Sequence, residues 1–402
     1  MILHKSLVIV AWYYSTAVWA IPYLVSLKGN ESLEAFFSYD LLHPATEQVK
    51  ALLTNSFSIG DFHGFSGNFS KSVVERIKKC PLVAEITPDF IVKAFDIEVQ
   101  EDAPRHLSRL SSLKKLKTGK STNYVYDNDA TGKGVYAYVL DSGVELGHPE
   151  FEGRARFGKD FTNEGSGDKN GHGTHVAGII GSKTYGAAKG VEMIEIKVLD
   201  TDGSGSLSTI ISALEFAVNH RMRSGKHGVA NLSLGAYRNA VLNRAVNAAV
   251  DTGLIVVVAA GNSNINACLT SPASAEKAIT VGAIDDFNDS LASFTNWGEC
   301  VDVFASGAYV KSLNALDYHN PETLSGTSMA APAVCGLIAN LLSEGVPANK
   351  VKSAVLQLSL KDQISRTSLF LRRGTPNRIA YNGIQEKERD WSSDSDSDSD
   401  EN

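Results

Sequence analysis

Three residues of the sequence have the types and settings that nucleophilic catalysis needs: an aspartate, a histidine and a serine, in that order. Asp141 ends an apolar run and precedes a turn at Ser142, His172 lies in the glycine-rich stretch 171–178, and Ser328 precedes apolar residues at helical spacing. A serine hydroxyl becomes a strong nucleophile when a histidine accepts its proton and a carboxylate orients that histidine. These residues therefore predict acyl transfer, with Ser328 as nucleophile, His172 as base and Asp141 as the orienting group.

Each of these residues also has a simpler interpretation. Asp141 and Ser328 both stand where a helix can begin, so each could be a helix cap and nothing more. His172 and His175 are three residues apart and could form a metal pair. A helical zinc protease, however, has a glutamate directly after the first histidine and a four-residue histidine spacing. Gly173 follows His172 here, so the sequence disfavours a zinc site.

The segments that must position these residues alternate between short apolar runs and amphipathic helices. Runs that are apolar on every residue predict parallel strands, and helices at 207–220 and 239–252 would cover the sheet. The predicted fold class is α/β, with a doubly wound, mostly parallel sheet that has helices on both faces. The active site of such a sheet lies at the carboxyl ends of its strands, where Asp141 is expected. The predicted strands are Val135–Leu140, Ile194–Leu199, Val229–Leu234, Leu254–Ala260, Ala278–Ile284 and Val301–Ala305.

The first 120 residues contain segments of a different kind. Residues 1–20 predict a signal peptide, with an apolar stretch too short and interrupted to span a membrane and small residues before a cleavage site after Ala20. Residues 36–97 predict a small α+β unit. Residues 105–120 are rich in Ser, Lys and Arg without an apolar period, and we expect an exposed linker or a lengthened surface segment there. Within the α+β unit we expect helices at 48–55 and 70–79 and strands at 83–86 and 90–94.

Composition and charge exclude some classes of function. The chain has 402 residues, enough for two or three domains, and 43% of them are hydrophobic, enough for a large core. The net charge is -7, and the tail 386–402 with eight acidic and two basic residues accounts for six of these charges. The rest is nearly neutral and gives no indication of a nucleic-acid partner. The Ser-Asp repeats of the tail, which we define as residues 385–402, cannot bury apolar area and predict disorder.

Three segments resemble the signature segments of the subtilisin-like serine proteases, most closely those of the proteinase K group. They are Val-Leu-Asp-Ser-Gly around Asp141, Gly-His-Gly-Thr-His-Val-Ala-Gly around His172, and Gly-Thr-Ser-Met-Ala around Ser328. Two positions depart from the pattern: Ala333 stands where a histidine is usual and Ser142 where a threonine is common. Neither belongs to the triad, so altered packing is expected there. Further matches at 124–127, 271–274, 279–283 and 374–383 extend the resemblance over nearly the whole chain.

The resemblance implies roles for further residues. Asn262 would complete an oxyanion hole together with the backbone N–H of Ser328. Two short segments match those that hold the substrate backbone in the family, and glycines in them let an extended peptide approach closely. Binding of this kind is tolerant of sequence and implies broad specificity. These segments are Gly203, Ser204 and Gly205, and Ser233, Leu234 and Gly235.

The small α+β unit resembles the inhibitory propeptide of the family. Residues 21–100 would then form a domain that assists folding and inhibits the enzyme, and residues 101–384 would form the peptidase domain. Self-cleavage is expected near Phe95–Glu101. An unrelated N-terminal domain is the alternative.

The four cysteines allow three complete pairings. Cys268 and Cys300 are a plausible pair in an oxidising compartment, and they match a disulfide of close relatives in the group. Cys335 is expected as a buried free thiol, and Cys80 would leave with the propeptide.

A calcium site is a further implication of the resemblance. Asp302, with the carbonyls of Glu276 and Ala278, resembles a calcium site of the proteinase K group. One carboxylate plus carbonyls specifies calcium weakly, and a surface aspartate without a metal is the alternative. We expect no required cofactor and no catalytic metal.

Together these patterns predict a serine endopeptidase made as a self-processing zymogen and delivered to the secretory pathway. We expect a monomer that acts on protein substrates outside the cell, at its surface or in a vacuole-like compartment. Sequons at Asn30, Asn68, Asn231 and Asn288 permit glycosylation, although Asn231 falls in a predicted buried strand.

Three other functions are alternatives. An inactive binding protein on the same fold would usually lack one of the catalytic residues, and all are present here. An esterase with the α/β-hydrolase fold would need a Gly-x-Ser-x-Gly elbow and the order Ser, Asp, His, and the sequence has neither. An interaction protein that acts through its acidic tail would leave the body of the chain unexplained.

Overall fold

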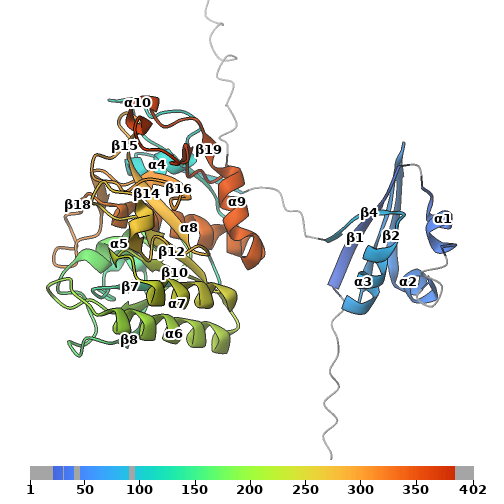
Figure 1. Ribbon diagram of the computed structural model, residues 1–402, viewed down its shortest axis with the longest axis horizontal. Coiled ribbons are helices and arrows are strands. Elements are labelled where there is room, and N and C mark those ends of the chain that lie inside the picture. The colour runs from blue at the N-terminus through green and yellow to red at the C-terminus, as the bar shows by residue number, and fades with distance from the viewer. Residues whose placement is uncertain (1–20, 30, 40–45, 90–95, 385–402) are drawn as a thin grey trace, which may run out of the picture. The chain divides into compact units, whose positions relative to one another are not determined.

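A computed structural model describes residues 21–384 except Asn30, residues 40–45 and residues 90–95. The chain forms two compact units, Met1–Ala94 and Phe95–Asn402, called here the N-terminal and C-terminal units (Figure 1). The division lies between Ala94 and Phe95 instead of between residues 100 and 101. The expected signal peptide, the acidic tail and the strand expected at 90–94 lie outside the described residues.

The described residues of the N-terminal unit form a four-stranded antiparallel sheet and three helices. Its strands are ordered β2-β3-β1-β4, with β1 starting directly after the expected signal cleavage site. An aromatic cluster of Phe36, Phe65 and Phe69 lies at the centre of its core. The elements are β1 Ile21–Leu27, α1 Leu33–Phe37, α2 Thr46–Leu52, β2 Leu53–Ile59, β3 Phe62–Phe69, α3 Lys71–Lys79 and β4 Val83–Pro88.

One helix prediction in this unit was wrong at its end. The sequence predicted a helix over 48–55, but the helix ends at Leu52 and the next residues begin β2. Pairing with β3 explains the change, since Asn55 lies opposite Ser66 and the hydroxyls of Thr54 and Ser66 are 2.7 Å apart. Hydrogen bonds across the sheet thus outweigh local helix preference in this segment.

The C-terminal unit is built on a mostly parallel sheet in the order β19-β20-β16-β14-β12-β10-β7-β9-β8. Its central strands are the predicted apolar runs, each shifted by no more than two residues at its ends. The strands of this sheet are β7 Val135–Asp141, β8 Ala155–Asp160, β9 Glu192–Lys197, β10 His227–Leu232, β12 Ile255–Ala259, β14 Ile279–Asp285, β15 Ser290–Leu291, β16 Val303–Ser306, β19 Leu360–Lys361 and β20 Arg378–Ile379. Shorter ribbons are formed by β5 Ile97–Gln100 with β6 Tyr124–Asp127, β11 Ala236–Tyr237 with β13 Thr270–Ser271, and β17 Val310–Ser312 with β18 Glu322–Leu324.

Helices cover both faces of this sheet, as expected. The helices α5 His172–Gly181 and α8 Thr327–Ser343 share one apolar core with the sheet. The helices α6 Leu207–Ser224 and α7 Ala240–Asp251 share a second core on the other face and lie side by side (Figure 1). Other short helices of this unit are η2 Pro149–Phe151, η3 Ala267–Leu269, η4 Ala348–Lys350, α9 Val351–Leu358 and α10 Arg366–Leu369.

The prediction of an exposed segment over residues 105–120 was wrong for the first half of that range. Residues Arg105–Ser111 form helix α4, in which Leu107, Arg109 and Leu110 are buried. The Arg109 guanidinium makes two hydrogen bonds to the Asp289 carboxylate, at 2.9 and 3.1 Å. The basic residue that made the segment look exposed is therefore held inside the fold by a distant acidic partner.

The boundary between the units also has a structural reason. Strand β5 pairs antiparallel with β6, from Ile97 opposite Asp127 to Gln100 opposite Tyr124. The Lys189 ammonium donates to the Gln100 side chain at 2.7 Å. Residues 97–100 are therefore built into the C-terminal unit, and a boundary after residue 100 would separate β5 from its partner strand.

Candidate active site

The predicted site residues come from the carboxyl ends of neighbouring strands and from the starts of two helices. Asp141 is the last residue of β7, and His172 is the first residue of α5. Ser328 is the second residue of α8, and Asn262 follows β12. Because the strands are parallel, their carboxyl ends meet at one edge of the sheet, where residues far apart in sequence converge.

Asp141 and His172 form a direct pair. The Nδ1 atom of His172 lies 2.7 Å from Oδ1 of Asp141, which is fully buried and also accepts from the Ser142 backbone N–H. Gly173 permits this approach, because a side chain there would collide with the Gly143 carbonyl. Burial lowers the pKa of His172, but the charge and hydrogen bond of Asp141 outweigh burial and raise that pKa above its ordinary value of 6.5.

A second carboxylate, which the sequence analysis missed, holds the loop before His172. Asp168 is buried and accepts hydrogen bonds from the backbone N–H groups of Gly171 and Thr174, both at 2.8 Å, and from the Ser142 hydroxyl at 2.9 Å. That hydroxyl in turn accepts from the Gly173 N–H at 3.1 Å. One side chain thus joins the end of β7 to the first turn of α5. An aspartate four residues before His172, where a helix begins, was the available signal.

Ser328 lies half-buried at the start of α8. Its hydroxyl donates to the Ser233 carbonyl at 3.3 Å, and the Ser233 hydroxyl donates to the Ser328 carbonyl at 2.9 Å. The helix start supplies backbone N–H groups without an intrahelical acceptor and the positive end of the helix dipole. An anion that forms next to Ser328, at the start of α8, would therefore be stabilised.

Two hydrogen-bond donors flank a small space beside Ser328. A side-chain atom added at Gly326 would lie 3.2 Å from Asn262 Nδ2 and 3.6 Å from the Ser328 backbone nitrogen. The Oδ1 atom of Asn262 accepts from the backbone N–H and the hydroxyl of Thr327, both at 2.8 Å. With its oxygen held in this way, the amide presents its N–H₂ group toward the same space as the Ser328 N–H.

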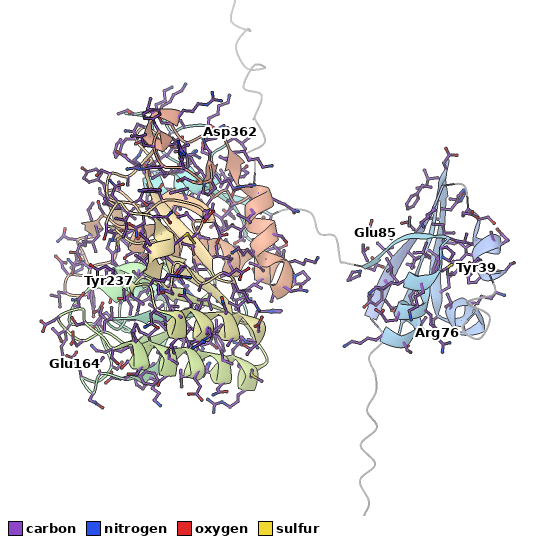
Figure 2. All side chains as sticks on the ribbon, in the orientation of Figure 1. Tyr39, Arg76, Glu85, Glu164, Tyr237 and Asp362 are labelled. Carbon is purple, nitrogen blue, oxygen red and sulfur yellow. A yellow bond between two sulfur atoms is a disulfide. The ribbon has the colours of Figure 1, made fainter. Side chains whose placement is uncertain are left out.

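The six predicted substrate-binding residues line one groove together with His172. This groove has a volume of about 440 Å³ and includes Gly203 to Gly205 and Ser233 to Gly235 in its wall. An adjoining cavity of about 770 Å³ shares Ser233 to Gly235 and is also lined by Asn262 and Ser328. Tyr237, labelled in Figure 2, also lines this cavity and is 89% exposed. The two hollows meet at the segment 233–235, so both sides of the candidate site open onto one binding region.

His175 does not join His172 in a metal pair. Its Nε2 atom lies 3.2 Å from the Glu322 carbonyl, which can only accept, so this nitrogen carries the hydrogen. Burial lowers the pKa of His175 to about 4. Among the residues that the structure describes, no group of three or more His, Cys, Asp or Glu side chains could hold a metal ion.

The residues that resemble a calcium site form an ion pair and hydrogen bonds with the ammonium of Lys352. The Lys352 ammonium lies 3.0 Å from the Asp302 carboxylate and donates to the carbonyls of Ala278 and Glu276, at 2.6 and 3.2 Å. The atoms that would ligate calcium therefore surround a cation that belongs to the chain itself. In this arrangement the residues do not fit a bound calcium ion.

The structure contains a disulfide between Cys268 and Cys300, which closes a loop over a sequence separation of 32. Cys80 and Cys335 are free and buried. Burial raises the pKa of the Cys335 thiol far above its ordinary range, so this cysteine is unreactive.

The comparisons with known proteins agree with this geometry. The subtilase family profile matches residues 132–385, and the peptidase inhibitor I9 profile matches residues 22–95. The chain therefore belongs to the subtilase family. It is a subtilisin-like serine endopeptidase that carries an inhibitor I9 propeptide domain ahead of the catalytic fold.

Relatives of known name share about two fifths of their residues with this chain. A subtilase-type proteinase RRT12 of Saccharomyces cerevisiae is 42% identical over 91% of this chain and 83% of its own length. Cerevisin of the same yeast is 40% identical over 90% of this chain and 59% of its own length. The crystal structure of a cold-adapted subtilisin-like serine proteinase matches 71% of this chain with a TM-score of 0.64 and 38% identity. The expected subtilisin-like fold is thus confirmed.

Proposed function

We propose that the chain is a zymogen that cleaves its own propeptide and then hydrolyses protein substrates through Asp141, His172 and Ser328. The observation that carries this proposal is the 2.7 Å contact between Asp141 and His172 at a groove that continues past Ser328. A buried carboxylate paired with a partly exposed histidine is what a serine nucleophile requires for activation.

The mechanism follows from these positions. The Ser328 hydroxyl turns from the Ser233 carbonyl toward His172, which accepts its proton as the oxygen attacks the scissile carbonyl. Catalytic hydrogen bonds are often formed only when substrate is bound. His172 then gives the proton to the leaving amine, and water hydrolyses the acyl-enzyme by the same proton transfers in reverse. Asp141 holds the imidazole and stabilises its charged form.

The tetrahedral intermediate would be stabilised in the space beside Gly326. Asn262 Nδ2 and the Ser328 backbone nitrogen both lie beside this space, and both are proposed to donate to the oxyanion. Loss of one such donor typically costs about 2.7–4 kcal/mol of transition-state stabilisation. Thr327 contributes indirectly, because its two hydrogen bonds fix the orientation of the Asn262 amide.

Substrate recognition is proposed to be broad. An extended peptide would pair through its main chain with Gly203 to Gly205 and Ser233 to Gly235, which line the same groove. None of the described residues that line the adjoining 770 Å³ cavity is charged, so this cavity is suited to an apolar or aromatic side chain next to the cleaved bond.

Self-cleavage is proposed to occur before Ile97. The expected range was Phe95–Glu101, but residues 97–100 form β5 in the C-terminal unit. A cut before Ile97 releases the inhibitor I9 domain and leaves the β5–β6 ribbon intact.

The proposed route is secretory, with removal of residues 1–20 as a signal peptide. The acidic tail at 385–402 stays part of the chain in this proposal. Among the described residues, no helix has the length and apolar character needed to cross a membrane. Glycosylation is proposed at Asn68 and Asn288, whose side chains are exposed. Asn231 is buried on β10 and donates to the Ser233 hydroxyl, so it is excluded as an acceptor.

The test compares wild type with Ser328→Ala by intact mass, before and after a fluorophosphonate probe that labels activated serines. We expect a shortened wild type that begins near Ile97 and carries the label on Ser328, and a full-length mutant without label. The loss of peptidase activity should be on the order of 10⁶-fold, the size known for a subtilisin that loses its nucleophile.

Two other outcomes would contradict parts of the proposal. An alanine variant that still matures in an isolated, protease-free preparation would exclude self-processing. A wild type that stays unlabelled after removal of its propeptide would favour an inactive binding protein on the same fold.

A further inference from the structure

The position that resembles a calcium site in this fold is filled by a side chain of the protein. Its three candidate oxygens come from two separate segments: the carbonyls of Glu276 and Ala278 precede β14, and Asp302 precedes β16. Lys352 comes from a third segment, as the second residue of α9. The site therefore lies where the end of the sheet meets a surface helix.

The lysine satisfies this position completely. An ammonium group has three donors and no acceptor, and Nζ of Lys352 has three oxygens around it, at 2.6, 3.0 and 3.2 Å. The charges also balance, because one carboxylate faces one ammonium. Asp302 is mostly buried, with a side chain 19% exposed. Because burial of an unpaired charge is unfavourable, the nearby ammonium stabilises the ionised carboxylate.

Calcium cannot share this arrangement. The ion takes six to eight oxygens at about 2.3–2.6 Å, whereas these three oxygens are arranged around Nζ. A calcium ion at this position would have to displace the ammonium and leave it beside a divalent cation. The Oδ2 atom of Asp302 that contacts the ammonium also accepts a hydrogen bond from the Thr280 N–H at 2.9 Å, so this oxygen is held by two groups of the chain.

We propose that Lys352 replaces a structural calcium ion: its ammonium occupies the cation position and holds α9 against the segments before β14 and β16 without a metal. The proposal does not depend on the catalytic roles given above. Its consequence is that this part of the fold is insensitive to calcium, and that loss of the lysine creates a dependence on calcium.

The test measures thermal unfolding of the full chain in a Ser328→Ala background, which removes autolysis from every sample. Wild type and Lys352→Ala are each compared in EDTA and in millimolar calcium chloride. We expect the wild-type midpoint to be the same in both buffers. The midpoint of Lys352→Ala should fall by several degrees in EDTA and recover in calcium, because the vacated oxygens then accept the ion.

A double variant and a milder variant test whether the recovery in calcium depends on the Asp302 charge and on loss of the lysine charge. Asp302→Asn added to Lys352→Ala should abolish the recovery, since it removes the charge that attracts calcium. Lys352→Gln keeps a hydrogen-bond donor without the charge and should fold even if the alanine variant does not, again with a lower midpoint in EDTA than in calcium. Titration calorimetry with calcium chloride should detect an Asp302-dependent site in Lys352→Ala and none in wild type.

Three results would overturn the proposal. One is an EDTA-induced fall in the wild-type midpoint that Asp302→Asn removes, because calcium would then displace the lysine. Another is a Lys352→Ala variant as stable as wild type in EDTA. The third is destabilisation of both Lys352 variants that calcium does not reverse, which would mean that the three oxygens do not form a cation position.

Discussion

The two units of this chain differ in what stabilises them. The N-terminal unit has one apolar core, built around Phe36, Phe65 and Phe69, and its cysteine, Cys80, is free. The C-terminal unit has an apolar core on each face of its sheet, a disulfide and a buried ion pair between Arg109 and Asp289. The first unit therefore depends on apolar burial, whereas the second adds covalent and charged connections between distant segments.

This difference fits the fates proposed for the two units. A small domain buries a smaller share of its surface than a large one and is correspondingly less stable. A propeptide that must be removed benefits from this, because local unfolding exposes it to proteolysis. An enzyme that must persist among proteases benefits from connections that resist unfolding.

The largest expected effect is on the N-terminal unit. Phe65→Ala deletes a fully buried ring that contacts Phe36 at a centroid distance of 4.9 Å. Such a change typically costs about 3–5 kcal/mol, which is a large part of the stability of a unit this size. Hydrogen exchange measured by mass spectrometry should show loss of protection in β1 to β3 and unchanged protection in β12.

The matched control is Phe62→Ala on the same strand. Phe62 is 51% exposed, so its removal should leave exchange in β1 to β3 nearly unchanged. Loss of protection in β12 as well as in β3 after Phe65→Ala would contradict the separation of the two units.

The next effect concerns the buried ion pair of the C-terminal unit. Asp289→Ala leaves the Arg109 guanidinium, which is 1% exposed, without its carboxylate partner. Removal of one member of a buried pair typically costs about 3–5 kcal/mol, because the other charge stays uncompensated. Urea unfolding followed by Trp297 fluorescence should report this loss, since Trp297 belongs to the C-terminal unit.

A double variant tests the cause of this loss. Arg109→Met with Asp289→Leu removes both charges and fills similar volume, so it should recover most of the stability lost by Asp289→Ala. Equal losses in the single and double variants would mean that packing of α4, and not the uncompensated charge, sets the cost.

The sequence analysis predicted the apolar strands correctly and missed polar contacts between distant segments. The central strands were predicted because parallel strands buried on both faces are apolar on every residue, as in β12. Helix α4 was missed because Arg109 makes sense only with Asp289, which is 180 positions away in the sequence. Lys352 was missed for the same reason, since its role depends on Asp302 and on carbonyls that folding brings close. Asp168 differs, because its place just before α5 was a local signal that the sequence analysis did not use. Polar connections across the fold have no local pattern.

A smaller effect is expected from the disulfide. Replacement of Cys268 and Cys300 by serine opens a loop over a sequence separation of 32 and gives the unfolded chain more conformations. The chain-entropy relation gives a loss of about 3–4 kcal/mol, confined to the C-terminal unit. Urea unfolding should detect it, with Cys335→Ser as a control that leaves the loop closed. An equal loss of protection in β3 would show that the disulfide also stabilises the N-terminal unit.

The smallest effect is a pH dependence of the C-terminal unit. Burial lowers the pKa of His106 to about 4, while its Nε2–H donates to the Tyr185 carbonyl at 2.9 Å. Between pH 4 and 6.5 the unfolded chain therefore binds a proton that the folded chain does not, so stability is full above pH 6.5 and falls as the pH is lowered. One pKa unit corresponds to about 1.4 kcal/mol, so the loss approaches about 3 kcal/mol near pH 4.

His106→Gln separates this contribution from the rest. Glutamine keeps a donor for the Tyr185 carbonyl but does not titrate, so the slope of unfolding free energy against pH should become shallower between pH 4 and 6.5. His175, whose pKa burial also lowers to about 4, contributes to the slope that remains, as do His148 and His220, whose pKa values burial lowers as well. His172 acts in the opposite direction, because Asp141 raises its pKa and its contribution is lost as pH rises through that raised value. An unchanged slope in His106→Gln would mean that this imidazole is protonated in the folded chain, against its burial in α4.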